Sequence, residues 1–294
     1  MGRTPRRNPR FRKGGDAVRF IHSFSSRPLG ISMYDTSALT RMIGNIWYFS
    51  LSVAYAKRSG AEIELHTDSF GRALLGHLPY DALYLTLDNM PDDIHPRFWA
   101  AGKIVALKEA SLGAVHIDGD VFVKRRELVT DWDRSEWDAL AQHYESTKWY
   151  AYQNRLFDRD RRFALSVGLD TRSKGLACNT GVIGFRDAAL KQEYIDGYLR
   201  MARHYSRFAD TLENTQLTPD VMIEQLWFYQ LMERRKANLK IVLDDDCPHE
   251  YAASLGFQHE ITMTKFALLD KCKATLRNVN PEIYDKTLKL CRNF

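Results

Sequence analysis

The sequence predicts an α/β protein with a mainly parallel central sheet and helices on both faces. Short apolar, strand-like segments alternate with long amphipathic, helix-like segments along the chain, which is the order typical of this class. An acidic motif directly follows one of these strands, where parallel sheets bind their ligands. Of the 294 residues, 45% are hydrophobic and 27% are charged, so the chain is long and apolar enough to bury one large core.

The first predicted elements are a strand beginning at residues 18–21 and a helix over residues 36–58. Apolar residues recur along this helix at steps of three and four, which places them on one face. These residues are Leu39, Met42, Ile46, Phe49 and Val53. The run Asp35-Thr36-Ser37 offers N-caps and Gly60 closes the far end, so both boundaries of the helix are marked in the sequence.

Two strands, a second helix and a further strand follow. We predict strands over residues 62–65 and 83–87, then a helix opened by Pro96 that continues to Glu109. The segment Ala114–Ile117 is a short apolar strand that stops at Asp118. The acidic motif therefore lies at the carboxyl end of a buried strand.

The second half of the chain continues the α/β order less regularly. Residues 149–152, 182–185 and 241–243 have the composition of strands, and residues 188–206 and 219–235 have helical periodicity. The chain contains no internal repeat and no second linker. We therefore expect one domain over residues 16–294.

Residues 1–15 are predicted to be a disordered basic tail. They contain two prolines, a glycine pair and six basic residues, and almost nothing that a core could bury. Removing these six charges from the net charge of +5 leaves −1, so the basicity belongs to the tail. The tail is interpreted either as a solubilising arm or as a weak contact for anionic lipid or RNA.

The four cysteines favour a reducing compartment. Cys178, Cys247, Cys272 and Cys291 have no metal-ligand spacing, and no apolar stretch follows the basic start as in a secretory signal. No apolar run is long enough to cross a bilayer. We therefore expect a cytoplasmic protein, with a membrane-peripheral location as the alternative that the tail allows.

The residues most typical of a reaction site are Asp118 and Asp120. Two carboxylates one residue apart after an apolar strand repel each other unless a cation lies between them. At a strand end both can reach one divalent ion, and Gly119 lets a ligand approach the backbone. The alternative is an acidic turn that binds nothing.

This segment resembles the DxD motif of GT-A glycosyltransferases, particularly the glycogenin-like and capsular-sugar transferase groups. The resemblance implies a Rossmann-like nucleotide-diphospho-sugar transferase fold and a site that binds Mn²⁺ or Mg²⁺. It implies that Asp120 is the firmer metal ligand, and that Asp118 contacts the metal or the ribose. In that family the metal holds the diphosphate of the sugar donor.

Lys103 and the stretch from Cys178 to Phe185 extend the resemblance. Lys103 lies 15 residues before Asp118, and the family has a donor-contacting lysine at similar spacing. The alternative is a solvated helix lysine that can be removed at little cost. Asn179 and Gly181 match the family's Asn-Ser/Ala-Gly-Val strand, whose asparagine and close-packed backbone face the donor sugar. An ordinary glycine-containing strand is the alternative there.

His259 and Lys265 resemble a His-x5-Lys pair near the end of the glycogenin-like enzymes. There the histidine is the third metal ligand and the lysine contacts the diphosphate, roles that suit imidazole and ammonium. The glycine between the two in the family is absent here. The pair Glu224-Gln225 is similar to an acidic-Gln pair that faces the sugar in related enzymes, and an amphipathic helix explains Glu224 equally well.

Together these matches imply transfer of a sugar from a nucleotide-diphosphate donor, most often a UDP-sugar, to a hydroxyl acceptor in glycan or polysaccharide synthesis. One alternative is a haloacid-dehalogenase-like phosphatase that uses Asp118 and Asp120, with Lys240 and the run Asp244–Asp246 as its later motif. Its nucleophile normally lies on the first strand, which argues against it. A second alternative is a non-enzymatic adaptor that binds nucleic acid or a membrane surface through its tail, which a body of charge −1 does not favour.

Overall fold

The structure of the chain is a computed structural model. It describes residues 19–30, 37–148, 150, 154–173, 175–208, 219–243, 249–260 and 267–294. The predicted tail, most of the predicted strand over residues 149–152, Lys265 and the run Asp244–Asp246 lie outside these residues. Within them, no helix combines the length and the apolar character needed to cross a membrane.

The centre of the fold is a seven-stranded sheet in the order β3-β2-β1-β4-β7-β6-β8. Only β7 runs against the other strands, because it pairs antiparallel with both β4 and β6 while the remaining pairs are parallel. The predicted fold class, an α/β protein with a mainly parallel sheet, is confirmed. The strands are β1 (Arg19–Phe24), β2 (Glu62–Thr67), β3 (Ala82–Tyr84), β4 (Val115–Ile117), β6 (Ala139–Ser146), β7 (Leu176–Phe185) and β8 (Leu239–Ile241).

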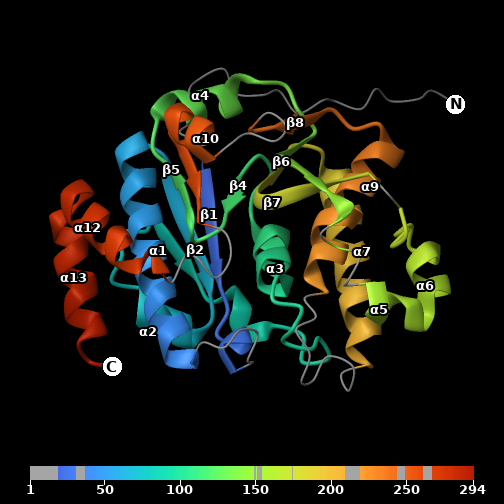
Figure 1. The fold of residues 1–294 in the computed structure, drawn as a ribbon, viewed down its shortest axis with the longest axis horizontal. Helices are drawn as coiled ribbons and strands as arrows, with labels where there is room; N and C mark the ends of the chain where they lie inside the picture. The colour runs from blue at the N-terminus through green and yellow to red at the C-terminus, as the bar shows by residue number, and fades with distance from the viewer. Residues whose placement is uncertain are drawn as a thin grey trace, which may run out of the picture.

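Helices cover both faces of this sheet, with α1 and the C-terminal pair α12 and α13 well separated from α3, α7 and α9 (Figure 1). The longer helices are α1 (Ala38–Ser59), α3 (Ala101–Glu109), α4 (Arg126–Arg134), α7 (Ala188–Ser206), α9 (Trp227–Arg235), α12 (Leu269–Val279) and α13 (Pro281–Cys291). The shorter ones are α2 (Ser69–Leu75), α5 (Asn154–Phe157), α6 (Arg161–Ser166) and α10 (His249–Leu255).

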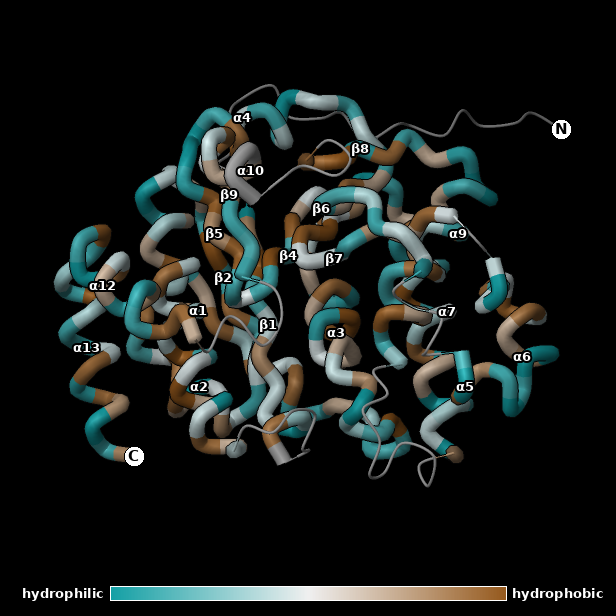
Figure 2. The backbone as a smooth tube through the Cα atoms, in the orientation of Figure 1, coloured by the Kyte–Doolittle hydropathy of each residue, from teal (hydrophilic) through white to brown (hydrophobic). Residues whose placement is uncertain are grey.

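Two hydrophobic cores lie on opposite faces of the sheet. Successive residues of a strand point to opposite faces, and Val182 packs with residues of α1, whereas Ile183 packs with residues of α7 and α9. Leu140 and Ala141 of β6 divide between the two cores in the same way. Strands buried on both faces carry near-continuous hydrophobic residues, and β5 (Val121–Val123), which follows the acidic turn, is coloured accordingly in Figure 2.

Helix α1 begins and ends at the residues that the sequence marks. The Ser37 side chain accepts a hydrogen bond from the Thr40 N–H at 3.1 Å, which satisfies a free donor of the first turn. Gly60 follows the helix with φ +80°, and its N–H bonds the Ala56 and Lys57 carbonyls. Helix α7 also has the bounds that the periodicity predicts.

Several elements differ from the prediction, among them β8, which spans Leu239–Ile241 where a strand over residues 241–243 was expected. Strand β3 ends at Tyr84, and residues Thr86–Asn89 form a 3-10 helix. Helix α3 begins at Ala101 instead of Pro96. The Asp220 side chain, from a distant segment of the chain, accepts the Ala100 N–H at 2.8 Å and so caps the start of this helix. The first part of the helix expected over residues 219–235 is a π-helix, Val221–Leu226.

A second, two-stranded sheet was not predicted. Strand β5 (Val121–Val123) pairs antiparallel with β9 (Phe257–His259), and Val121 lies opposite His259. The Glu260 N–H also donates to the Asp120 carbonyl at 3.1 Å. This pairing brings the segment that carries His259 onto the turn that carries Asp118 and Asp120.

Candidate metal centre

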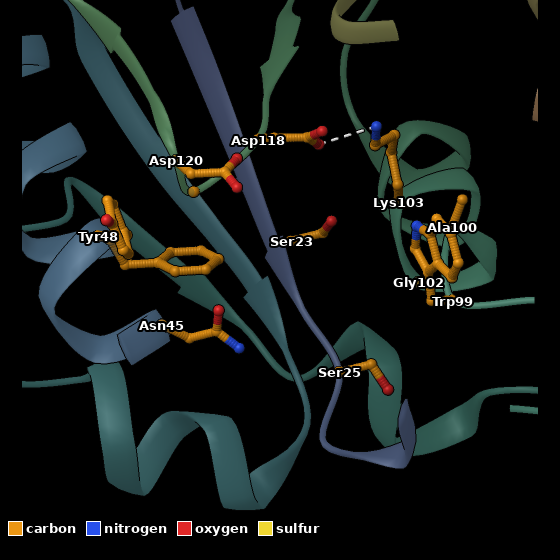
Figure 3. A pocket seen from close by; sticks show the side chains of 12 residues that line it. Ser23, Ser25, Asn45, Tyr48, Trp99, Ala100, Gly102, Lys103, Asp118 and Asp120 are labelled. Carbon is orange, nitrogen blue, oxygen red and sulfur yellow. Dashed lines mark ion pairs between the residues drawn. The ribbon is translucent and has the colours of Figure 1, made fainter. Parts of the chain in front are cut away.

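The acidic turn lies at the point where the strand order of the sheet reverses. From β1 the chain proceeds outward through β2 to β3, whereas β4 lies on the other side of β1. Ligands of open α/β sheets bind outside the carboxyl ends of strands at such a point. A cavity of about 220 Å³ occupies this position. Its walls come from β1, α1, α3 and the acidic turn, and include Ser23, Asn45, Tyr48, Lys103, Asp118 and Asp120 (Figure 3).

The backbone of the acidic turn is held on both sides. The Asp118 N–H donates to the Gly181 carbonyl at 2.8 Å, and the Val121 N–H donates to the Asp118 carbonyl at 2.9 Å. A Cβ at Gly119 would lie 2.2 Å from the Phe49 ring. The packing of Phe49 therefore requires a glycine at position 119. From the sequence alone, this glycine was explained by the approach of a ligand instead.

Asp118, Asp120 and His259 form a group of side chains that fits a divalent cation. Each offers one ligand atom, and these atoms lie within 4.8 Å of one another. His259 Nε2 lies 3.4 Å from Asp120 Oδ1. Carboxylate oxygens suit Mg²⁺ and Mn²⁺, and imidazole is compatible with Mn²⁺. The cation would also offset the repulsion between the two carboxylates.

The electrostatics of Asp118 reflect a crowded, negatively charged site. Burial raises the pKa of Asp118 to about 6, with Lys103 lowering it and Asp120 and Glu224 raising it further. Beneath it, His116 Nδ1 lies 3.7 Å from Asp118 Oδ1, and His116 Nε2 contacts the Ser23 hydroxyl at 2.8 Å. Burial lowers the pKa of His116 well below its usual value, so this histidine is neutral.

Lys103 is buried, and it is not the solvated lysine that one sequence interpretation allowed. Its Nζ contacts Asp118 Oδ1 at 2.8 Å, Glu224 Oε1 at 2.6 Å and the Thr180 carbonyl at 3.0 Å. Burial lowers the pKa of Lys103, but Asp118 and Glu224 outweigh it, and the pKa lies above its ordinary value. Glu224 Oε1 also accepts from the Thr180 hydroxyl at 2.7 Å. The lysine thus joins the acidic turn to the π-helix.

Asn179 and Gln225 lie in a second polar cluster, which contains a glutamate that the sequence did not reveal. Asn179 Nδ2 donates to Glu145 Oε1 at 2.6 Å, and Asn179 Oδ1 accepts from the Gly181 N–H at 2.9 Å. The Tyr150 hydroxyl contacts both the Glu145 carboxylate and Gln225 Oε1. Burial raises the pKa of Glu145, but hydrogen bonds from His143, Tyr150 and Asn179 lower it below its usual value. Glu145 belongs to no motif, so only the pairing of β6 with β7 places it here.

Gly181 has a packing role beside the metal group. A Cβ at this position would lie 2.5 Å from His259 Cε1 and 2.6 Å from Gln142 Oε1. Only glycine leaves room for both side chains. Of the later residues that the phosphatase interpretation uses, Lys240 is described, and it forms an ion pair with Asp131 at 2.8 Å.

Comparisons with known proteins give distant structural likenesses and one family. No curated protein matches the chain in sequence. The galactosyltransferase LgtC in complex with donor and acceptor sugar analogues is 12% identical over 76% of this chain and 73% of its own, with a TM-score of 0.35. An active-site mutant of LgtC has the same identity over 76% and 72%, with a TM-score of 0.36. The bifunctional glycosyltransferase WbbM is 12% identical over 95% of this chain and 52% of its own, with a TM-score of 0.41.

A protein-family model gives the match in sequence. It is described as a family of unknown function (DUF6734) and matches residues 19–290. This range extends from the first residue of β1 into α13, and so includes the whole central sheet and the metal group. The chain therefore belongs to this family.

Proposed function

We propose that the protein is a metal-dependent glycosyltransferase of the GT-A type, which moves a sugar from a nucleotide-diphosphate donor to a hydroxyl acceptor. The observation that carries the proposal is the convergence of Asp118, Asp120 and His259 beside a cavity at the carboxyl ends of β1 and β4. Residues more than 130 positions apart in the sequence meet here, and they are the metal ligands that the DxD resemblance implies. A surface turn that binds nothing needs no such convergence.

Asp120 and His259 would hold Mn²⁺ or Mg²⁺, with Asp118 as the third ligand or as a contact to the ribose. When bound, the cation supplies charge stabilisation for the diphosphate that leaves the sugar. Lys103 lines the cavity and contacts Asp118, so it fixes the carboxylate and adds a positive charge on the donor side. Lys265, which lies outside the described residues, is proposed to contact the diphosphate.

The sugar is proposed to lie toward Asn179, Gly181, Glu224 and Gln225. Support comes from the hydrogen bonds that join Asn179 to the Gly181 backbone and Glu224 to Lys103. These contacts fix polar groups next to the metal group, which is what orientation of a sugar requires. The acceptor hydroxyl, on a glycan or polysaccharide, would attack the anomeric carbon as the bond to the diphosphate breaks. UDP is the proposed carrier.

The proposal is tested by following nucleoside-diphosphate release from a panel of sugar nucleotides with Mn²⁺, Mg²⁺ or excess chelator. We expect release from at least one donor, dependence on the metal, and loss of release in His259→Ala. A donor that is cleaved equally well in excess chelator would contradict the metal-dependent mechanism.

A further inference from the structure

Val121 is the residue through which the three proposed metal ligands are joined. It follows Asp120 directly, and its N–H donates to the Asp118 carbonyl at 2.9 Å. It also lies opposite His259 in the β5–β9 pair. A displacement of Val121 would therefore change the spacing of all three ligand side chains, and the contacts of its own carbonyl limit how far it can move.

The Val121 carbonyl is held by helix α1 and not by β9. The Glu260 N–H donates to the Asp120 carbonyl at 3.1 Å, so these two residues form a hydrogen-bonded pair of the ladder. Pairs with and without mutual hydrogen bonds alternate between antiparallel strands, so the N–H and carbonyl of the next residue, Val121, both point away from β9. This carbonyl accepts from the Ser52 hydroxyl of α1 at 2.6 Å. Both residues are buried, so water cannot readily replace the bond.

His22 and Tyr80 orient the Ser52 hydroxyl. The serine has one proton, which it donates to the Val121 carbonyl, so its oxygen accepts from His22 Nε2 at 3.0 Å. Burial lowers the pKa of His22 to about 3, so the ring is neutral, and its Nδ1 accepts from the Tyr80 hydroxyl at 2.9 Å. The hydrogen bonds from Tyr80 through His22 and Ser52 to Val121 therefore match each donor to one acceptor.

His22 supports the acidic turn through a second contact. Its ring meets the Phe49 ring edge-on, with the centroids 4.9 Å apart. Phe49 in turn packs directly against the turn, since a Cβ at Gly119 would lie 2.2 Å from its ring. A single residue of β1, which is 0% exposed, is therefore connected to Gly119 through Phe49 and to Val121 through Ser52.

We propose that His22 and Ser52 are positioning residues, which fix Val121 and so hold the three proposed ligands at the spacing that a cation requires. The inference rests on the proposed metal site and adds two residues that the DxD resemblance does not include. Apolar side chains of similar size would fill this part of the core without burying polar groups, so packing alone does not account for the relay. Loss of residues that orient metal ligands typically lowers metal affinity about 10- to 100-fold.

Ser52→Ala tests the proposal against the matched control Ser50→Ala. Ser52→Ala leaves the Val121 carbonyl without its donor, and we expect its affinity for Mn²⁺ to fall about 10-fold. Ser50 lies on the same helix and is 0% exposed, but its hydroxyl contacts the Thr287 hydroxyl of α13 at 2.9 Å. We therefore expect Ser50→Ala to lose stability and to bind Mn²⁺ like the wild type. The measurements are calorimetric titration with Mn²⁺ alone and urea unfolding of each protein.

Tyr80→Phe tests whether the relay acts through Ser52. It removes only the hydroxyl that contacts His22 Nδ1, and we expect a smaller loss of Mn²⁺ affinity than Ser52→Ala gives. Combining the two substitutions should cause no further loss, since the tyrosine acts through the serine. A full additional loss in the combined variant would overturn the relay.

The remaining outcomes separate the positioning role from the metal site itself. Equal affinities of Ser52→Ala and the wild type, or an equal fall in Ser50→Ala, would overturn the positioning role while the metal site stands. A wild type that binds no Mn²⁺ would overturn both. Should Ser52→Ala fail to fold, Tyr80→Phe alone decides, because an affinity equal to that of the wild type would then overturn the proposal.

Discussion

At the scale of single residues, Lys103 shows how burial changes the consequence of a mutation. Its position on a helix suggested a side chain that could be trimmed at little cost. In the structure it is 8% exposed and neutralises the buried carboxylate of Glu224 and the half-buried carboxylate of Asp118. The helical pattern of residues 101–109 could not reveal this, because the partners come from the turn after β4 and from the π-helix.

We predict that Lys103→Met lowers the free energy of unfolding by about 3–5 kcal/mol, the usual cost of leaving one partner of a buried ion pair unpaired. Adding Glu224→Gln to this variant should restore part of the loss, because it removes one of the stranded charges. Urea unfolding of the two variants and the wild type measures both effects. A Lys103→Met protein as stable as the wild type would show that the ion pairs of Lys103 with Asp118 and Glu224 contribute nothing to stability.

Gly181 offers a second prediction at this scale. We expect Gly181→Ala to weaken Mn²⁺ binding about as much as His259→Ala, because the new Cβ would lie 2.5 Å from the His259 ring and displace it. Gly184→Ala on the same strand is the matched control. Its Cβ meets Val115 and Trp137 at 3.2 and 3.3 Å, far from the metal group, so it should change stability without changing metal affinity. Equal Mn²⁺ titrations for Gly181→Ala and the wild type would refute this reasoning.

At the scale of elements, the pairing of β5 with β9 positions the candidate site. Local periodicity predicts α1 and α7, because their patterns repeat over many residues. It does not predict a three-residue strand whose partner lies more than 130 residues away in the sequence. The apolar strand before Asp118 marks the acidic turn in the sequence, whereas no local pattern marks Glu145, which the pairing of β6 with β7 brings to the site.

We predict that Phe257→Ala in β9 weakens metal binding as well as stability. Phe257 is buried against residues of α1 and β5, and its truncation should cost about 3–5 kcal/mol and loosen the strand that carries His259. Phe228→Ala in α9 is the control, because Phe228 is equally buried in the opposite core. If both variants fold at low temperature and retain the same Mn²⁺ affinity, β9 does not position His259.

At the scale of the whole molecule, three neighbouring strands each bury one histidine: His22 in β1, His66 in β2 and His116 in β4. Burial lowers the pKa of His22 to about 3, against a raising effect of Asp120, and lowers that of His66 to about 4. Both side chains titrate near pH 6.5 in the unfolded chain, so the unfolded state binds more protons below that pH. The contribution of these two neutral histidines to the free energy of unfolding is therefore complete above pH 6.5, and it falls as the pH is lowered.

We predict that lowering the pH from 7 to 5 destabilises the wild type by about 2 kcal/mol more than it destabilises His22→Gln. The comparison between the two proteins is needed because Asp220, whose pKa burial raises well above its ordinary value, acts in the opposite direction over this range. Urea unfolding at both pH values gives the difference. Identical pH dependence in the two proteins would show that His22 is not held neutral.

The central claim is that Asp118, Asp120 and His259 form a metal site for a sugar nucleotide. Its most direct test is calorimetric titration of Mn²⁺ in the presence of UDP, with the wild type, Asp120→Asn and the control Asp131→Asn, an exposed acid outside the site. We expect the wild type and the control to bind equally, and Asp120→Asn to fold but to lose most of its affinity, because a hard cation prefers the charged oxygen. Equal binding by the wild type and Asp120→Asn would contradict the account.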